Sequence, residues 1–238
     1  MRPAIRHNGA MTEIHPKAAK PFRDESFPVL YPILDADFVL RDVSPGSAAR
    51  RTLLQRIARE LEAAGVTLLQ YRNKRDPDSV FLEDSRAIRA AAPSIRLILN
   101  DRAALVAAAG AAGVHVGQRD TPPAQVRALL GPHLFVGLST HTAEQVLAAD
   151  REPIDSIAIG PVFATASKSD TDPVVGLEGV RHARTLTRKP LIAIGGISVA
   201  NAAAVLAAGA NSLAVIGAVF GSGRSPAHAV QAFLAISK

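Results

Sequence analysis

Three features of the sequence predict a closed (β/α)8 barrel, the fold also called a TIM barrel. Eight short apolar runs, bounded by Gly or polar residues, are typical of parallel strands that are buried on both faces. Stretches with helical apolar periodicity separate them, and 238 residues is close to the ~250 usual for this fold. The expected strands are Val29–Leu34, Val66–Gln70, Arg96–Leu99, Gly113–Val116, Phe135–Leu138, Ser156–Ile159, Leu191–Ile194 and Ser212–Ile216.

The ends of the intervening helices are marked by a recurring Ala-Gly signal. Gly65, Gly110 and Gly209 each follow an Ala-rich stretch and precede an apolar run, as a glycine that ends a helix does. A further helix is expected at Pro226–Ile236. An open doubly wound sheet would have fewer strands and a G-x-G-x-x-G after the first one, and the sequence has neither.

Residues 1–27 differ in composition from the rest of the chain. They contain Pro3, Pro16 and Pro21, several Arg and Lys, and no apolar periodicity. Because they lack an apolar core of 7–15 residues, a secretory signal is not expected. We interpret this segment as a disordered N-terminal extension, with a targeting peptide as the alternative, and residues 28–238 as a single barrel domain.

Composition restricts the classes of partner. The chain has no Cys, which excludes disulfides, thiolate nucleophiles and Cys-bound zinc, and it has no apolar run long enough for a membrane span. The net charge is +6, but aromatic residues make up only 4% and the Arg residues are scattered among Ala-rich helices. Small anions are therefore expected as ligands rather than nucleic acid or a membrane. A cytoplasmic location is the default expectation, and a homo-oligomer is compatible with the sequence.

Polar residues cluster just after several expected strands, where parallel α/β proteins assemble their sites. Gln70, Arg72 and Lys74 alternate past the second strand, so an extended backbone points all three the same way, as a diphosphate site needs. A solvated loop is the alternative. Asn100, Asp101 and Asp120 follow the third and fourth strands, and two carboxylates are suitable ligands for Mg²⁺. Both Asp residues could instead cap the helices that follow.

Later strands carry further candidates. Ser139 follows the fifth strand, and a long loop after the sixth carries Thr165, Ser167 and Lys168. That loop could hold a polar ligand and a departing anion, or it could be a charged loop without a role in binding. The sequences Gly195-Gly196 and Ile216-Gly217 follow the last two strands, where barrels bind phosphate on backbone N–H groups, although the glycines could serve turns only. We interpret His115 as a hydrogen-bonded core residue and place His141 near a helix N-terminus.

Taken together, these segments resemble the thiamine phosphate synthase family over roughly residues 29–236. The segments that carry the resemblance, in chain order, are Gly65–Lys74, Asn100–Arg102, Gly113–Asp120, Gly137–His141, Gly160–Phe163, Thr165–Lys168, Asp172–Gly179 and Ala193–Ile197. The resemblance implies a barrel enzyme that joins a pyrimidine diphosphate to a thiazole phosphate and releases pyrophosphate.

The resemblance also implies roles for the candidates. Gln70, Arg72, Lys74 and Asn100 would hold the pyrimidine diphosphate, and Asp101 and Asp120 would bind Mg²⁺. Ser139 and Lys168 would contact the pyrimidine substrate or its pyrophosphate, and together with Arg72 they are the expected catalytic residues. Thr165 and Ser167 would face the thiazole, and Gly196, Ile216 and Gly217 would cradle its phosphate.

Four positions depart from the usual pattern of the family. Asn73 stands where Glu is usual, Ala164 where Pro is usual, and Ser167 where Thr is usual. Gly217 stands where Ser is frequent, so a phosphate there would rely on backbone N–H groups. Asn73 is expected to point away from the row of donors. Two alternatives to a synthase are an isomerase of thiazole phosphate on the same fold and a non-catalytic phosphate-binding barrel.

Overall fold

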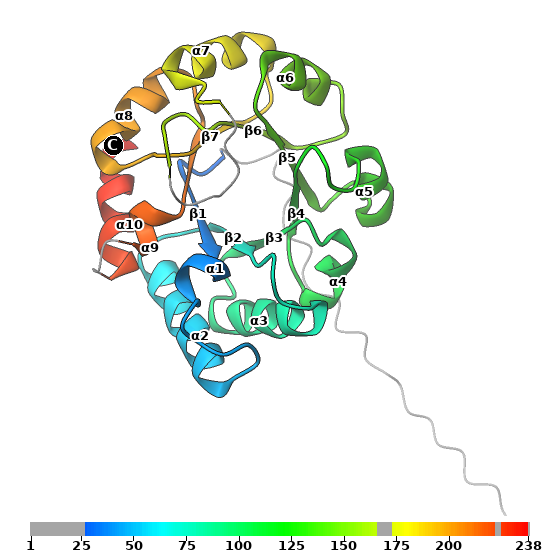
Figure 1. The fold of residues 1–238 in the computed structure, drawn as a ribbon, viewed down its shortest axis with the longest axis vertical. Helices are drawn as coiled ribbons and strands as arrows, with labels where there is room; N and C mark the ends of the chain where they lie inside the picture. The colour runs from blue at the N-terminus through cyan, green and yellow to red at the C-terminus, as the bar shows by residue number, and fades with distance from the viewer. Residues whose placement is uncertain (1–26, 166–172, 222–224, 238) are drawn as a thin grey trace, which may run out of the picture.

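The chain forms a closed parallel barrel. The structure, a computed structural model, describes residues 27–165, 173–221 and 225–237. Eight strands pair in sequence order, and β8 closes the ring onto β1 (Figure 1). The predicted (β/α)8 barrel is therefore confirmed. The strands are β1 Leu30–Asp35, β2 Leu68–Arg72, β3 Arg96–Asn100, β4 Gly113–Val116, β5 Phe135–Thr140, β6 Ser156–Ile159, β7 Leu191–Ile194 and β8 Ser212–Val215.

The helices surround the strands as an outer ring (Figure 1). Short helices α1 and α9 follow the first and last strands, and α10 packs against α2 to complete the ring. Gly65, Gly110 and Gly209 all have positive φ just past helix ends, as predicted. The helices are α1 Ala36–Val39, α2 Ala48–Ala63, α3 Asp78–Ala91, α4 Val106–Ala109, α5 Pro123–Leu130, α6 Ala143–Asp150, α7 Gly176–Leu186, α8 Val199–Ala207, α9 Gly217–Phe220 and α10 Pro226–Leu234, with 3₁₀ turns at Ala103–Leu105 and Ala235–Ser237.

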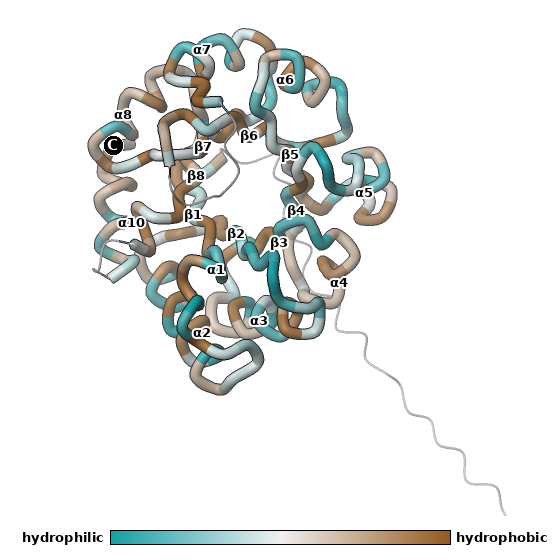
Figure 2. The backbone as a smooth tube through the Cα atoms, viewed as in Figure 1, coloured by the Kyte–Doolittle hydropathy of each residue, from teal (hydrophilic) through white to brown (hydrophobic). Residues whose placement is uncertain are grey.

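Two apolar clusters hold the barrel together. The larger lies between the strands and the helices, and the smaller fills the interior with Tyr31, Ile33, Leu68, Ile98, Phe135, Ala158, Ile192, Ala214 and Ile216. Apolar colour follows the strands in Figure 2, with hydrophilic stretches beside β2, β3 and β4. Phe27, which the sequence assigns to the N-terminal extension, packs its ring 6.4 Å from that of Tyr31 and 6.0 Å from that of Phe135. The other residues of the extension, 1–26, lie outside the described residues.

The strand ends differ from the sequence prediction in a way that matters for the site. β2 runs two residues further than predicted, to Arg72, and β5 runs two residues further, to Thr140. β3 includes Asn100. The backbone ladder of a parallel sheet continues through polar residues, whereas the sequence criterion stopped at the last apolar one. Several site candidates therefore belong to the strands themselves.

Arginines connect successive units around the barrel. Arg127 of α5 donates to the carbonyl oxygens of Gly131, Leu134 and Pro153 at 2.6–3.0 Å and to the Asp155 carboxylate at 2.6 Å. Arg89 of α3 and Arg184 of α7 bind carbonyl groups in the same way. Because these carbonyls lie outside regular helices and strands, each guanidinium satisfies several acceptors that would otherwise need water.

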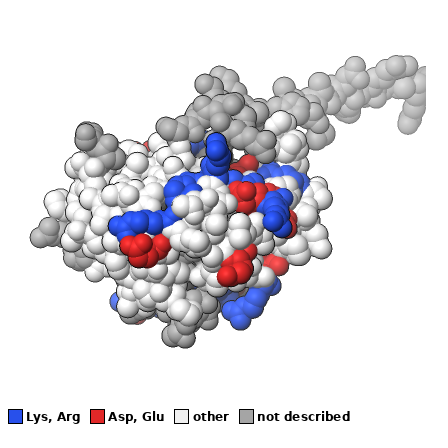
Figure 3. Space-filling model, turned by 90° about the horizontal axis from the view of Figure 1, so that it is seen from above, with Lys and Arg blue, Asp and Glu red and all other residues white. Residues whose placement is uncertain are grey.

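The surface carries mixed charge. On the described part of the face in Figure 3, basic and acidic side chains lie next to one another rather than in a continuous basic stripe. Among the residues that the structure describes, no helix has the length and apolar character needed to cross a membrane.

Candidate functional site

A hollow opens at the carboxyl end of the barrel, where the strands bring four of the candidates together: Gln70, Arg72, Asn100 and Ser139. Its polar lining comes from Tyr31, Gln70, Arg72, Asn100, His115 and Ser139, and its apolar lining from Ile33, Ala158, Ile192, Ile194 and Ala214. The alternation of side chains along each strand explains this set, since Gln70 and Arg72 share one side of β2 as predicted. The Tyr31 hydroxyl, at the buried end, has no hydrogen-bond partner among the described residues.

Two hydrogen bonds fix side chains of neighbouring strands in the hollow. The Gln70 amide donates from Nε2 to Oδ1 of Asn100 over 2.9 Å. His115 Nε2 lies 2.8 Å from the Ser139 hydroxyl. His115 is buried and hydrogen-bonded, as predicted, but its partner is a site candidate, so His115 belongs to the lining of the hollow.

Arg72 forms an ion pair that the sequence did not reveal. Its guanidinium donates to the carboxylate of Asp35, the last residue of β1. The Arg72 side chain is only 15% exposed, so the solvated-loop interpretation is wrong for this residue. Asp35 follows an apolar strand just as Asp101 does, and that signal could have identified it.

The Lys74 ammonium reaches across to the third strand. It lies 3.4 Å from a carboxylate oxygen of Asp101, and half of its side-chain surface remains exposed. Lys74, two residues after Arg72, thus lies beside a predicted metal ligand.

The carboxylates of Asp101 and Asp120 come together from the loops after β3 and β4. Burial, together with contact with Asp120, raises the pKa of Asp101 to about 6, against the opposing effect of Lys74. Asp101 also has φ 62°, a left-handed conformation that is uncommon for residues other than glycine. Within the described chain, no third His, Cys, Asp or Glu joins them in a cluster that could hold a metal.

The helix-capping alternative for both Asp residues is wrong. The turn after β3 has Arg102 at its cap position, and the Asp101 side chain accepts no capping hydrogen bond there. Helix α5 begins at Pro123 with Pro122 as its cap, while the Asp120 carboxylate accepts the Gly117 N–H over 2.7 Å. Neither carboxylate caps a helix, and both lie at the carboxyl end of the barrel, which we call its mouth.

A buried polar network lies behind the second strand. Arg50 of α2 donates to the carboxylates of Asp84 and Asp76, each at 2.7 Å. The Tyr71 hydroxyl donates to Asp84 over 2.5 Å. Burial raises the pKa of Tyr71 and also that of Asp84.

Asn73 and Arg102 connect this network to the site. Asn73 points away from Gln70 and Arg72, as predicted, but it is buried and donates to both Tyr71 and Asp76. A Glu here, which the resemblance to the synthase family leads us to expect, would add a third carboxylate around Arg50. Arg102 donates to the carbonyls of Asn73 and Asp76 at 3.1 and 2.6 Å and lies over the Phe81 ring. Arg102 directly follows Asp101, so these hydrogen bonds link the loop that carries Lys74 to the loop that carries Asp101.

The glycines after β7 allow two loops to pack closely. Gly195 and Gly196 have φ of 101° and 63°, and a Cβ on Gly196 would come within 2.7 Å of Ala164 O. Glycine is therefore required by the backbone here, whether or not a ligand binds. Ile216 precedes α9 and Gly217 begins it, after the neighbouring strand β8.

The loop after β6 is described only in part. Thr165 is exposed and lies within it, whereas Ser167 and Lys168 lie outside the described residues. His141 precedes Thr142, the cap of α6, as predicted, and its Nδ1 lies 2.7 Å from Gly160 O.

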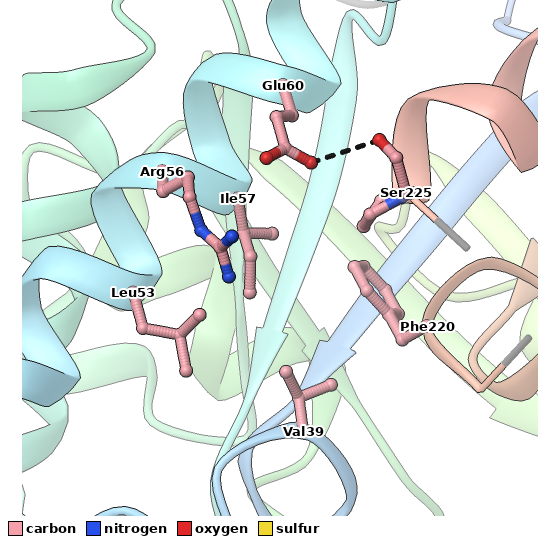
Figure 4. A pocket seen from close by; sticks show the side chains of 8 residues that line it. Val39, Leu53, Arg56, Ile57, Glu60, Phe220 and Ser225 are labelled. Atoms are coloured by element: carbon pink, nitrogen blue, oxygen red, sulfur yellow. Dashed lines mark hydrogen bonds between the residues drawn. The ribbon is translucent and has the colours of Figure 1, made fainter. Parts of the chain in front are cut away.

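A second pocket lies on the outside of the barrel, between α2 and α10 (Figure 4). Apolar side chains such as Leu53 and Phe220 form its lower part, and Glu60 accepts a hydrogen bond from Ser225 at its edge. None of the described site candidates lines it, so the mouth of the barrel is the candidate site.

Comparison with known proteins agrees with this geometry. The family described as "Thiamine monophosphate synthase" matches residues 41–219. A thiamine-phosphate synthase of Koribacter versatilis is 50% identical over 190 residues, which cover 79% of this chain and 87% of the relative. One from Albidiferax ferrireducens is 44% identical over 174 residues, covering 72% and 79%.

Solved structures agree as well. A thiamine phosphate pyrophosphorylase from Pyrococcus furiosus superposes with a TM-score of 0.74 at 30% identity, covering 87% of this chain and 94% of that one. A 3-hexulose-6-phosphate synthase, at 18% identity and a TM-score of 0.61, shares the fold alone. On the strength of the family match and these relatives, the chain belongs to the thiamine monophosphate synthase family.

Proposed function

We propose that the chain is a thiamine phosphate synthase. It would condense 4-amino-2-methyl-5-hydroxymethylpyrimidine diphosphate with 4-methyl-5-(2-phosphoethyl)thiazole to give thiamine phosphate and pyrophosphate. The observation that carries the proposal is the convergence of Gln70, Arg72, Asn100 and Ser139 on one hollow, with Lys74, Asp101 and Asp120 beside it.

The diphosphate would bind at the ends of β2 and β3. Arg72 offers a forked guanidinium, Lys74 a point charge and Asn100 an amide, which together suit a diphosphate. The apolar lining of the hollow, with Ser139 and His115 on one wall, suits a flat heterocycle that carries a few polar atoms. Lys168 would approach the departing pyrophosphate from the β6–α7 loop.

Asp101 and Asp120 would hold Mg²⁺. The two carboxylates face each other, and burial together with Asp120 raises the pKa of Asp101. A bound cation would offset the repulsion between them. Magnesium typically takes one or two carboxylates and fills its remaining positions with water and phosphate oxygens. Bound there, it would neutralise charge on the leaving diphosphate.

The chemistry fits charge stabilisation rather than covalent catalysis. The bond from the pyrimidine methylene carbon to the diphosphate oxygen breaks, and the electron pair leaves with the pyrophosphate. The resulting pyrimidine-methyl cation is captured by the lone pair of the thiazole nitrogen, which forms the C–N bond. Arg72, Lys168 and Ser139 would stabilise the leaving group and orient the cation, and no general base is needed.

The thiazole phosphate would occupy the opposite side of the mouth. Thr165 and Ser167 would face the thiazole, and the backbone N–H groups around Gly196, Ile216 and Gly217 would cradle its phosphate. A phosphate between the loops after β7 and β8 is a frequent arrangement in barrels of this kind. We further propose small phosphorylated molecules as partners and the cytoplasm as the compartment, in keeping with a biosynthetic family.

One assay tests the proposal. Purified protein is incubated with both substrates and Mg²⁺, and thiamine phosphate and pyrophosphate are quantified together. Equal amounts of both products support the synthase. An isomerase would convert the thiazole phosphate alone and would have no use for the donors of β2 and β3. Binding of thiazole phosphate without any binding of pyrimidine diphosphate, at every Mg²⁺ level, would therefore overturn the proposal.

A further inference from the structure

We propose that Asp35 is a positioning residue that sets the direction of the Arg72 guanidinium at the diphosphate site. This inference rests on the proposed function, because it assigns Asp35 its role through the binding of a diphosphate by Arg72. Asp35 itself would not touch the substrate.

The pairing of the strands places the two residues side by side. Asp35 and Arg72 are the last residues of β1 and β2 and are partners in the parallel ladder. Within the described part of the chain, no other residue hydrogen-bonds to the Arg72 side chain. The orientation of that guanidinium therefore depends on Asp35.

Asp35 is itself held firmly. It is 1% exposed, and its Oδ1 accepts the Asp37 N–H over 3.0 Å while its Oδ2 accepts from Arg72. Asp35 thereby caps α1 and binds Arg72 at the same time. A carboxylate fixed at both oxygens can hold a long and flexible arginine in one rotamer. The Arg72 side chain then loses less conformational entropy when a diphosphate binds.

The burial of Asp35 makes its pairing with Arg72 necessary. An isolated carboxylate at 1% exposure would be strongly disfavoured, so Asp35 requires the positive charge of Arg72 nearby. Since Arg72 also lines the hollow, its remaining N–H groups stay available to a ligand. The arrangement keeps a cation at the mouth while restricting where it points.

The same turn offers a matched control. Asp37 pairs with Arg75 over 3.2 Å, two residues along from Asp35, but the Arg75 side chain is 76% exposed. Asp37→Asn removes one carboxylate from the first turn of α1 and leaves the backbone N–H that Asp35 accepts. An exposed pair of this kind is expected to contribute little.

The experiment compares Asp35→Asn, Asp37→Asn, Arg72→Ala and the double variant Asp35→Asn/Arg72→Ala. Asp35→Asn keeps an acceptor for the α1 cap and removes the charge, and Asp35→Ser is a second variant that keeps the cap if Asn folds poorly. Each protein is assayed for kcat and for KM of both substrates, and circular dichroism confirms folding. Full activity of the unmodified chain establishes the proposed function independently of Asp35.

A positioning role predicts a loss confined to one substrate. Asp35→Asn should lower kcat/KM for the pyrimidine diphosphate about tenfold or more, the scale of a charge-assisted contact. The KM for thiazole phosphate should stay within about twofold, and Asp37→Asn should match the unmodified chain. In the Arg72→Ala background the Asp35 substitution should have no further effect.

Three results would overturn the inference. Folded Asp35→Asn could retain full activity, the Asp35 effect could persist undiminished without Arg72, or Asp37→Asn could cause an equal loss. If the unmodified chain makes no thiamine phosphate at all, the proposed function itself fails, which is a different outcome from any of these.

Discussion

The side-chain amide of Gln70 donates to the side-chain oxygen of Asn100 over 2.9 Å, linking β2 to β3 at the base of the mouth. Because this bond occupies the Asn100 oxygen, the Asn100 NH₂ group is left as the donor that can face a ligand. The relationship explains why an amide, rather than a carboxylate, suits position 100 beside a diphosphate.

Asn100→Asp therefore tests the polarity of the mouth. The substitution preserves shape and the acceptor for Gln70, but it places negative charge where the diphosphate is expected. We predict at least tenfold weaker binding of pyrimidine diphosphate, measured by calorimetric titration, because a charge-assisted hydrogen bond contributes ~1.5–3 kcal/mol. Binding of thiazole phosphate, titrated separately, should be unchanged, and an equal loss for both substrates would contradict the assignment.

Asp101→Asn should separate activity from stability. Asparagine tolerates the left-handed backbone at this position, φ 62°, and cannot supply the anionic ligand, so activity with Mg²⁺ should fall by orders of magnitude. Chelation by EDTA should abolish the activity of the unmodified protein. Unchanged activity in this variant with excess chelator would remove the metal assignment.

Without metal, Asp101→Asn should make the folded protein more stable, although it lowers activity. The folded-state pKa of Asp101 is raised to about 6, so its ionised form destabilises the fold above that pH. This cost disappears as the pH falls through 6 toward the unfolded value near ~3.9. Asp101→Asn should thus raise the free energy of unfolding by about 1–3 kcal/mol at pH 8, with the gain fading at pH 4, as measured by urea denaturation.

The boundary of the N-terminal extension can be tested with one deletion and one substitution. Deleting residues 1–26 should change melting temperature and activity little, because their composition offers little to bury. Phe27→Ala should lower the free energy of unfolding by about 1–2 kcal/mol, and with it the melting temperature, because the Phe27 ring packs on Tyr31 and Phe135. Equal melting temperatures for the two variants would contradict the packing role of Phe27.

The sequence was sufficient to predict the barrel because periodicity and glycine stops depend on local residues. It placed the mouth correctly for Gln70, Arg72 and Asn100, since alternation along a strand is a local property. Asp35 itself carries the local signal of an acid at the end of an apolar run, but the Asp35–Arg72 pair and the Arg50 network could not be predicted, because their partners are 21–37 residues away in sequence. No local pattern predicts that Arg72 of β2 meets the carboxylate at the end of β1.

Gly217 stands at a position where the family frequently has Ser. Gly217 begins α9 and is not among the glycines with positive φ, so a side chain is compatible with its backbone. Gly217→Ser would add a hydroxyl donor at the expected phosphate cradle and remove a flexible residue from a helix start. We expect KM for thiazole phosphate to fall severalfold while KM for pyrimidine diphosphate stays constant.

Gly196→Ser is the contrasting variant for that test. Its φ of 63° and the 2.7 Å approach of a Cβ to Ala164 O make any side chain strained there. This substitution should lower the melting temperature and raise KM for thiazole phosphate. If instead Gly217→Ser leaves that KM unchanged or raises it, the phosphate does not bind at the start of α9, and the cradle assigned to Gly196, Ile216 and Gly217 must be abandoned.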